Sequence, residues 1–161
     1  MTAANQPTIR FGFEVKELSN RLMVSIARKI VSEEIPKFIP ESYDAITSYL
    51  RREGVEVIGP PFYVCPYPDA EGKVDGEAGV FVKTRVAGEG DIVCRTLKGG
   101  RVASTLYKGD YKNLDTAYRA LEEWITREGL EKAGPPRELY LNDPGNVPPE
   151  EWLTEVLWPV A

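Results

Sequence analysis

The sequence of 161 residues predicts an α+β fold made of two pseudo-twofold-related strand-helix-strand-strand repeats, with mostly antiparallel sheets and a helix on each. Two observations support this prediction. Residues 43–61 and 118–136 align without a gap at an offset of 75 positions, and nine of the nineteen residues are identical. The segments around them also follow one order twice, as two strands, a helix and two more strands. Repetition at a fixed offset is typical of a duplicated unit that buries its apolar face against its twin.

Length and composition fit one domain that contains both repeats. With 42% apolar residues, a chain of this size is able to bury roughly 70% of its unfolded surface. We therefore expect residues 1–161 to form a single domain, with a first repeat over about residues 10–87 and a second over about residues 90–160.

Each repeat is expected to open with a β-hairpin. Residues 11–18 alternate between apolar and polar types, Ser19 and Asn20 suit a tight turn, and residues 21–31 are predicted to form the returning strand. The second repeat shows the same arrangement, with strands at 91–97 and 101–108 around a turn at 98–100.

A helix is expected after each hairpin, over about residues 40–53 and 112–128. In both segments apolar residues recur at intervals of three and four positions, which places them on one helical face. Gly54 and Gly129 follow the last periodic residues and can adopt the left-handed conformation that ends a helix. The second helix is expected to be capped by Asp110 or Asn113.

Two further strands complete each repeat. The Gly-Pro-Pro that ends each aligned segment cannot continue a helix, so residues 62–65 and 137–141 are expected to be extended. In the first repeat a polar loop at 68–76 precedes a strand at 78–86. In the second repeat the strand at 153–160 is expected to pair with residues 137–141.

Charge and composition exclude several classes of function. The formal charge is −5 and basic residues do not cluster, so we expect no nucleic-acid surface, because phosphate neutralisation needs grouped Lys and Arg. Neither a leader nor an apolar run of membrane-spanning length is visible, which predicts a cytoplasmic protein with no membrane contact. The chain has no histidine, which removes Ser-His-Asp and Cys-His nucleophilic sites and histidine-ligated zinc or haem.

Neither a metal nor a cofactor is expected. Cys65 and Cys94 are isolated in the sequence and fit free thiols in a reducing compartment. The glycine pair at 99–100 suits a turn and opens no helix, so it does not form a phosphate-binding loop.

A cleft is expected between the two repeats, and strand alternation predicts which side chains face it. In the second repeat Leu139 and Leu141 suit the helix-covered face of the sheet, so Glu138 and Tyr140 are expected to point into the cleft. This cleft would hold one carboxylate among aromatic rings. A carboxylate in apolar surroundings is costly unless it is paired or protonated, and aromatic faces attract cations.

The same alternation assigns the matching positions of the first repeat. Phe62 and Val64 are expected under the helix, whereas Tyr63, Cys65 and Tyr67 are expected in the cleft.

In the second predicted hairpin, alternation directs Thr105 and Tyr107 to the cleft. Val102 and Leu106 are then expected to pack against the second helix.

Structural roles for several of these residues stay open at this stage. A solvent-exposed Glu138 paired with Arg101 or Arg137 is the alternative to a carboxylate in the cleft. Cys65 also suits a small buried core residue. Trp152, beside a proline-rich loop, fits either a cover over the cleft or a packing anchor for that loop.

Three segments resemble the GyrI-like small-molecule-binding family, which also supplies the effector-binding domain of multidrug-responsive regulators of the AraC and MerR types. They are WITREGL at the end of the second helix, PRELYLNDP at 136–144 and the closing LTEVLWPV. The resemblance implies a duplicated strand-helix-strand-strand fold with a pocket between the halves. It also implies that Glu138, in the E-x-Y pattern with Tyr140, recognises lipophilic cations. One departure is YKGDY at 107–111, where many relatives carry a histidine.

The resemblance implies a stand-alone binding protein, since no helix-turn-helix segment precedes the domain. We expect a hydrophobic small molecule, often cationic or aromatic, held by Glu138, Tyr140, Tyr63, Cys65, Tyr67, Tyr107 and Trp152. One alternative is a hydrolase of strained cyclopropane-type xenobiotics, with Glu138 as base or nucleophile. Another is a protein that modulates DNA gyrase. Binding without catalysis is the preferred hypothesis, and enzymatic activity is left undecided.

Overall fold

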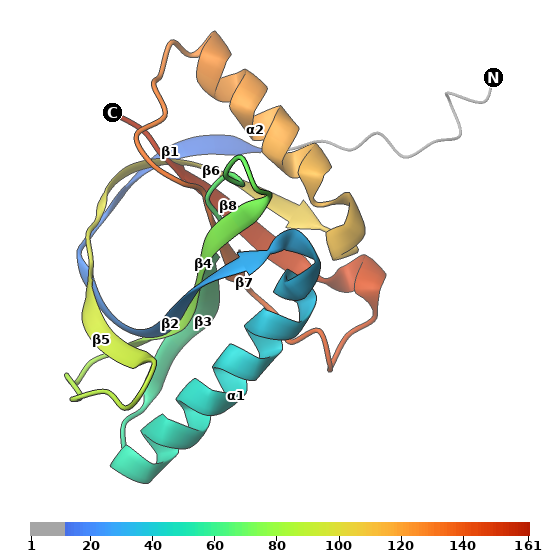
Figure 1. Cartoon of the computed structure of the whole chain (residues 1–161). Helices are drawn as coiled ribbons and strands as arrows, with labels where there is room; N and C mark the ends of the chain where they lie inside the picture. Colours follow the sequence, from blue (N-terminus) through green and yellow to red (C-terminus); the bar gives the residue numbers. More distant parts are fainter. Residues whose placement is uncertain (1–11) are drawn as a thin grey trace.

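The computed structural model describes residues 12–161 (Figure 1). Residues 10 and 11, where the first repeat and its first strand were predicted to start, lie outside the described residues. The strands are β1 (Phe13–Leu18), β2 (Arg21–Val31), β3 (Val57–Val64), β4 (Lys73–Val82), β5 (Ile92–Leu97), β6 (Gly100–Lys108), β7 (Arg137–Tyr140) and β8 (Leu153–Pro159). The α-helices are α1 (Ile35–Glu53) and α2 (Asp115–Arg127). Within the described residues, no helix is long and apolar enough to span a membrane.

The eight strands form one continuous sheet in the order β1-β6-β8-β7-β3-β4-β2-β5. Every neighbouring pair is antiparallel. If each strand is exchanged for its counterpart in the other repeat, the order reads the same from the opposite end. This symmetry confirms the predicted α+β fold of two pseudo-twofold-related repeats, whose strands share a single sheet.

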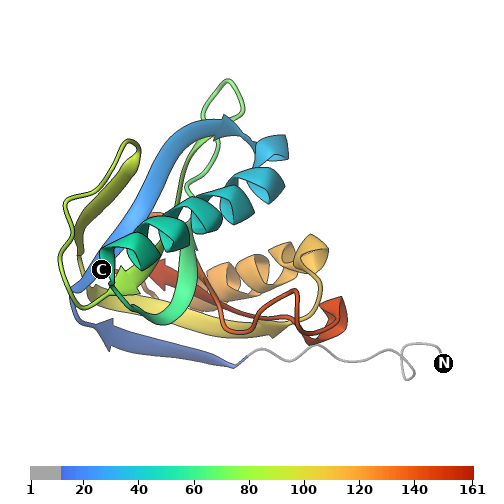
Figure 2. The same ribbon diagram turned by 90° about the horizontal axis from the view of Figure 1, so that it is seen from below.

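The two predicted hairpins are wrong. β1 pairs with β6, and β5 pairs with β2, so each repeat gives its first strand to the other repeat. Leu18 faces Gly100 and Arg21 faces Leu97, and the same register continues through both pairs. The four strands therefore form one long two-stranded ribbon that bends at its middle (Figure 2).

For the first predicted hairpin, the reason lies in the turn residues. A two-residue hairpin turn requires a positive φ at one or both central positions. Among the described residues every positive φ belongs to a glycine, so Ser19 and Asn20 do not supply one. The backbone bends at these residues without reversing and enters the other half of the molecule.

Both helices end as predicted but begin elsewhere. Gly54 and Gly129 each have φ of 69°, the left-handed conformation expected after a helix. α1 starts before the predicted residue 40, because Pro36 fits the first turn and the helix also contains Pro40. A 3₁₀ turn (Tyr111–Asn113) precedes α2, and the Asp110 carboxylate caps this turn by accepting the Lys112 N–H at 3.0 Å.

β4 begins and ends earlier than the predicted strand at 78–86, so the end of the predicted polar loop belongs to it. Its first residues, from Lys73 to Gly76, pair with the last residues of the long strand β2, from Arg28 to Val31. β3 also begins before the predicted residue 62, with a bulge between Ile58 and Phe62 at the two prolines. The predicted pairing of β7 with β8 is confirmed.

Both helices cover the same face of the sheet, and the bent ribbon curves away on the other side (Figure 1). The core beneath α1 contains Tyr63 and Tyr140, and the core beneath α2 contains Tyr107. The opposite face has its own core of Met23, Phe62 and Phe81, with Val64 and Leu139 packed against it.

The predicted assignment of the two faces is therefore reversed. Phe62, Val64 and Leu139 do not lie under the helices, and Leu106, predicted to face α2, is 53% exposed. The apolar residues misled the assignment because the curved ribbon encloses the second face, so the centre of the sheet is buried on both sides. Of the side chains predicted to face a cleft, Tyr63, Tyr107, Glu138 and Tyr140 point towards the helices.

Candidate functional site

Glu138 lies beside the pseudo-twofold axis of the sheet. The central strands β3 and β7 pair so that Tyr63 stands directly opposite Glu138. These two residues are 75 positions apart, the offset of the duplication, so they occupy the same position in the two repeats. The molecule therefore has one carboxylate at the point where its two halves meet.

Two tyrosine hydroxyls hold the Glu138 carboxylate. Tyr118, on α2, donates a hydrogen bond to Oε2, and Tyr140, two residues along β7, donates one to Oε1 at 2.7 Å. Glu138 is only 8% exposed. Burial raises the pKa of its carboxyl above the usual value of 4.5, and the two hydroxyl hydrogen bonds oppose this shift.

The first repeat contributes the counterparts of these residues. Tyr43, on α1, corresponds to Tyr118, and Cys65 corresponds to Tyr140. Burial, followed by the nearby Glu138 charge, raises the pKa of the Tyr43 hydroxyl and raises the pKa of the Cys65 thiol to about 12. Both groups are therefore neutral at physiological pH.

Tyr63 has a polar atom that lacks a partner. Its hydroxyl is buried, and no other group in residues 12–161 forms a hydrogen bond with it. Burial raises the pKa of this hydroxyl, with smaller contributions from Cys65 and Glu138. Buried polar groups without partners are uncommon and often mark functional positions.

Further aromatic rings connect this cluster to the proline-rich loop. The Tyr140 ring lies 6.5 Å from that of Tyr43 and 5.7 Å from that of Tyr111, measured between centroids. Tyr111 in turn stacks on Trp152 at 4.4 Å. The Trp152 Nε1 donates to the carbonyl oxygen of Val147 at 3.1 Å, which ties this ring to the loop. Trp152 thus lies at the outer end of a row of rings.

Glu138 and six neighbours form one cluster, the aromatic site: Tyr43, Tyr63, Cys65, Tyr111, Tyr118 and Tyr140. Of the residues predicted from the sequence, Glu138, Tyr140, Tyr63 and Cys65 lie in this site, and Trp152 borders it.

Tyr107 and Tyr67 are not brought to Glu138. The Tyr107 ring packs in the core beneath α2, and its hydroxyl donates to the Asp110 carbonyl oxygen at 2.8 Å. Tyr67 is 65% exposed, with its ring 6.1 Å from that of Trp158.

Sequence reasoning missed Tyr43, Tyr111 and Tyr118. The signal for two of them was present, because Tyr43 and Tyr118 are the identical residues that begin the two aligned segments. The apolar spacing of the second helix placed the Tyr118 ring in a helix core, and Tyr43 received no role. Their positions at the edge of each stripe direct their hydroxyls towards the sheet.

The chemistry of the aromatic site is that of a lone acid. Throughout the described residues, no Lys or Arg forms an ion pair with Glu138, and its hydrogen-bond partners are the two hydroxyls. Residues 12–161 also contain no group of three or more Cys, Asp or Glu side chains arranged to hold a metal. A buried carboxylate with no cation beside it, surrounded by rings, suits a positively charged organic ligand.

Comparison with protein families gives a match to the GyrI-like small molecule binding domain over residues 12–161. The match includes nearly the whole chain, and the protein therefore belongs to the GyrI-like small molecule binding domain family. Among curated proteins, none matches the chain significantly.

Solved structures share this fold at low sequence identity. The crystal structure of the EcmrR C-terminal domain has a TM-score of 0.81 and 24% identity, over 95% of this chain and 99% of that domain. In an EcmrR–DNA complex determined by cryo-EM, at 23% identity and a TM-score of 0.81, 93% of this chain is covered but only 57% of EcmrR.

Two other structural relatives are more distant. SAV2435 bound to tetraphenylphosphonium has a TM-score of 0.68 and 16% identity, over 93% of this chain and 94% of that one. A hydrolase from Listeria innocua has a TM-score of 0.69 and 15% identity, over 92% and 91% of the two chains. At these identities the similarity establishes the fold alone.

Proposed function

We propose that the protein binds hydrophobic, positively charged small molecules at the aromatic site, with Glu138 as the counter-charge. The observation that carries this proposal is the burial of Glu138 without a cationic partner in the described chain. Removing a carboxylate from water costs free energy, and a bound cation would offset that cost. The free protein thus holds an acid that a ligand can neutralise.

The surrounding rings supply the second part of the binding energy. Each cation–π contact contributes on the order of 0.5 to 2 kcal/mol. The rings of Tyr43, Tyr118 and Tyr140 come from three different elements, so they can contact different faces of one ligand. Such contacts depend little on ligand shape, so the site is expected to accept a range of ligands.

Ligand binding requires a local change in this site. Tyr118 and Tyr140 occupy both carboxylate oxygens in the free protein. Because Glu138 is also buried, a bulky cation reaches the carboxylate only if at least one of these tyrosine side chains moves. We propose that Tyr118 moves, because its half-buried ring lies on α2, whereas Tyr140 is buried within the sheet.

Tetraphenylphosphonium is a suitable probe, since SAV2435 binds it and shares the fold. In isothermal titration calorimetry we expect saturable binding of tetraphenylphosphonium. Tetraphenylborate has nearly the same size and shape but the opposite charge, so in a separate titration it should not bind. Equal affinity for the two ions would show that hydrophobic size alone governs binding, and the proposal would then fail.

A hydrolytic function is the second candidate, supported by the raised pKa of Glu138 beside two hydroxyls, an arrangement that suits general acid–base chemistry. Incubation with a cyclopropane-bearing compound distinguishes the two, because stoichiometric binding without product excludes catalysis. The suggested gyrase partner and the cytoplasmic location stay predictions from the sequence.

A further inference from the structure

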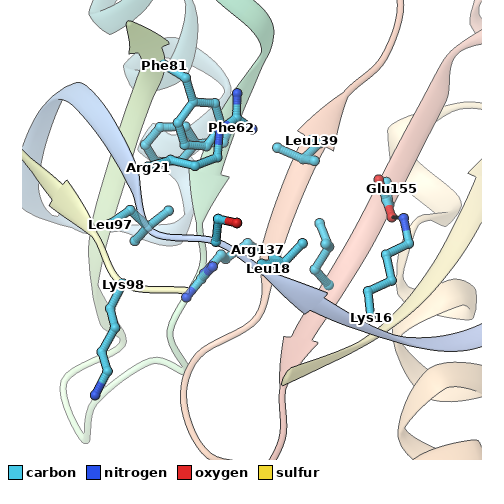
Figure 3. Close-up of a pocket in the computed structure, with 12 residues that line it drawn as sticks. Lys16, Leu18, Arg21, Phe62, Phe81, Leu97, Lys98, Arg137, Leu139 and Glu155 are labelled. Carbon is cyan, nitrogen blue, oxygen red and sulfur yellow. Dashed lines mark hydrogen bonds and ion pairs between the residues drawn. The ribbon is translucent and has the colours of Figure 1, made fainter. Parts of the chain in front are cut away.

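A hollow lies on the face of the sheet opposite the helices (Figure 3). It has a volume of about 90 Å³ and opens to the surface. Its apolar wall comes from β1, β3, β4, β5, β7 and β8, through Leu18, Phe62, Phe81, Leu97, Leu139 and Leu157. This hollow shares no residue with the aromatic site.

The charges around this hollow are mainly positive. Four basic side chains line it, together with a single carboxylate: Lys16, Arg21, Lys98, Arg137 and Glu155. The whole protein, by contrast, carries a formal charge of −5. A local excess of positive charge on an acidic protein is a feature to explain.

Only one of the four cations is neutralised by the carboxylate. Lys16 Nζ lies 2.5 Å from Glu155 Oε2, which also accepts a hydrogen bond from Ser104 at 2.6 Å. In residues 12–161, Arg21, Lys98 and Arg137 have no ion pair. Residues 1–11 contain no Asp or Glu that could supply one.

Arg21 is held against an aromatic ring, and both arginines are partly buried. The Arg21 guanidinium carbon lies 3.6 Å from the centroid of the Phe81 ring, and Phe81 stacks on Phe62 at 4.8 Å. A guanidinium stacked on a ring keeps its N–H donors free at its edge. Burial lowers the pKa of both Arg21 and Arg137, so each guanidinium has lost part of its hydration, and for Arg137 the charge of the nearby Glu77 carboxylate opposes this shift.

The two repeats differ at two adjacent positions of the central strands, one on each face of the sheet. Arg137 precedes Glu138 on β7, so the two side chains point to opposite faces. At the corresponding positions, the first repeat carries Phe62 and Tyr63. The second repeat thus adds a carboxylate on the helix side, opposite Tyr63, and a guanidinium on the other side, opposite Val64.

From this geometry we propose that the hollow is a second binding site, which takes a small amphipathic organic anion. Arg21 and Arg137 would bind its carboxylate, and the apolar wall with Phe62 would contact a ring or short chain. The size supports a small ligand, because an apolar cavity of about 150 Å³ is known to hold benzene. The enclosed part of this hollow is smaller, so part of the ligand lies in the open mouth.

Benzoate is the probe for this site, and benzyl alcohol is the neutral control of similar size. In a ¹⁵N NMR titration of the full chain, benzoate should shift the amides of Leu18, Leu97 and Leu139 in a saturable manner. Higher ionic strength should weaken this binding. Arg137→Met and Arg21→Met should each raise the Kd for benzoate about tenfold or more, because each removes a charge-assisted hydrogen bond.

Arg51→Met is the matched control, since Arg51 is exposed on α1 and forms no ion pair in the described residues. It should leave benzoate binding unchanged. The proposal is overturned by an absence of saturable shifts, by shifts confined to other residues, by unchanged affinity in both arginine variants, or by equal affinity for benzyl alcohol. If an arginine variant does not fold, the shift map and the benzyl alcohol comparison on the unmodified protein decide.

This inference does not depend on the proposed function. Glu138→Gln should leave benzoate binding unchanged, since Glu138 faces the other side of the sheet. The two proposals are therefore tested separately: tetraphenylphosphonium binding tests the aromatic site, and benzoate binding tests the hollow.

Discussion

Glu138→Gln is expected to lower the affinity for tetraphenylphosphonium about 100-fold, since removing one partner of a buried charge pair costs at least 2 kcal/mol. Glutamine keeps the size of the side chain and can still accept a tyrosine hydrogen bond. The loss therefore reports the missing charge, because the shape of the aromatic site is preserved. Isothermal titration calorimetry at pH 7 measures this change directly.

Glu123→Gln is the control for this variant. Glu123 is exposed on α2 and forms no ion pair in the described chain, so its replacement removes the same charge far from buried rings. We expect an unchanged Kd. If Glu138→Gln lowered affinity no more than Glu123→Gln, the buried carboxylate would have no role in recognition, and rings alone would bind the ligand.

Gly99→Ala is expected to destabilise the fold by about 3 kcal/mol, because new atoms in a closely packed position force the surroundings to move. A Cβ atom on Gly99 would lie 2.0 Å from the Leu18 carbonyl oxygen and 2.6 Å from the Ser19 carbonyl carbon. Both are backbone atoms at the bend of the ribbon, where the Gly99 N–H also donates to Asn20 Oδ1 at 2.8 Å. Only glycine fits this approach, and urea denaturation measures the loss.

Gly12→Ala provides the comparison. No atom lies within 4 Å of a Cβ built on Gly12, so alanine there should change the free energy of unfolding by less than about 0.5 kcal/mol. Equal stability of the two variants would argue against the close crossing of the two ribbon strands. It would favour the separate hairpins that the sequence suggests.

The duplicated architecture could be predicted because the repeat is written in the sequence itself. The identity between residues 43–61 and 118–136 is high enough to define two equivalent helices. Glu138 could be singled out because Tyr63 occupies the matching position, so the carboxylate is an exception to the symmetry. Alternation then placed Tyr63, Cys65, Glu138 and Tyr140 on one face, where the structure brings them together.

The pairing of the outer strands could not be predicted from local patterns. Residues 13–18 and 21–31 alternate equally well as a hairpin or as one bent strand, and the choice depends on partners that lie far along the chain. Ser19-Asn20 has turn-forming residues, which favoured the hairpin. The absence of a glycine there was the overlooked signal.

The prediction of which side chains face the helices was wrong for a related reason. Phe62 and Leu139 are apolar because the bent ribbon buries them. This ribbon forms only when the two repeats exchange their first strands. Tyr63 and Tyr140 are buried beneath α1 although each carries a hydroxyl. Apolarity therefore did not distinguish the helix side from the ribbon side.

The central claim is that the buried Glu138 carboxylate is the counter-charge for a bound cation. Its most direct test is a ¹³C NMR titration of the Glu138 carboxyl, with and without tetraphenylphosphonium. Burial predicts a pKa above the usual 4.5 in the free protein. A bound cation stabilises the ionised form and so lowers this pKa, and by linkage the cation binds more tightly as pH rises through the free-state pKa. A Glu138 carboxyl that titrates at its ordinary value, or whose pKa the cation leaves unchanged, would contradict this account.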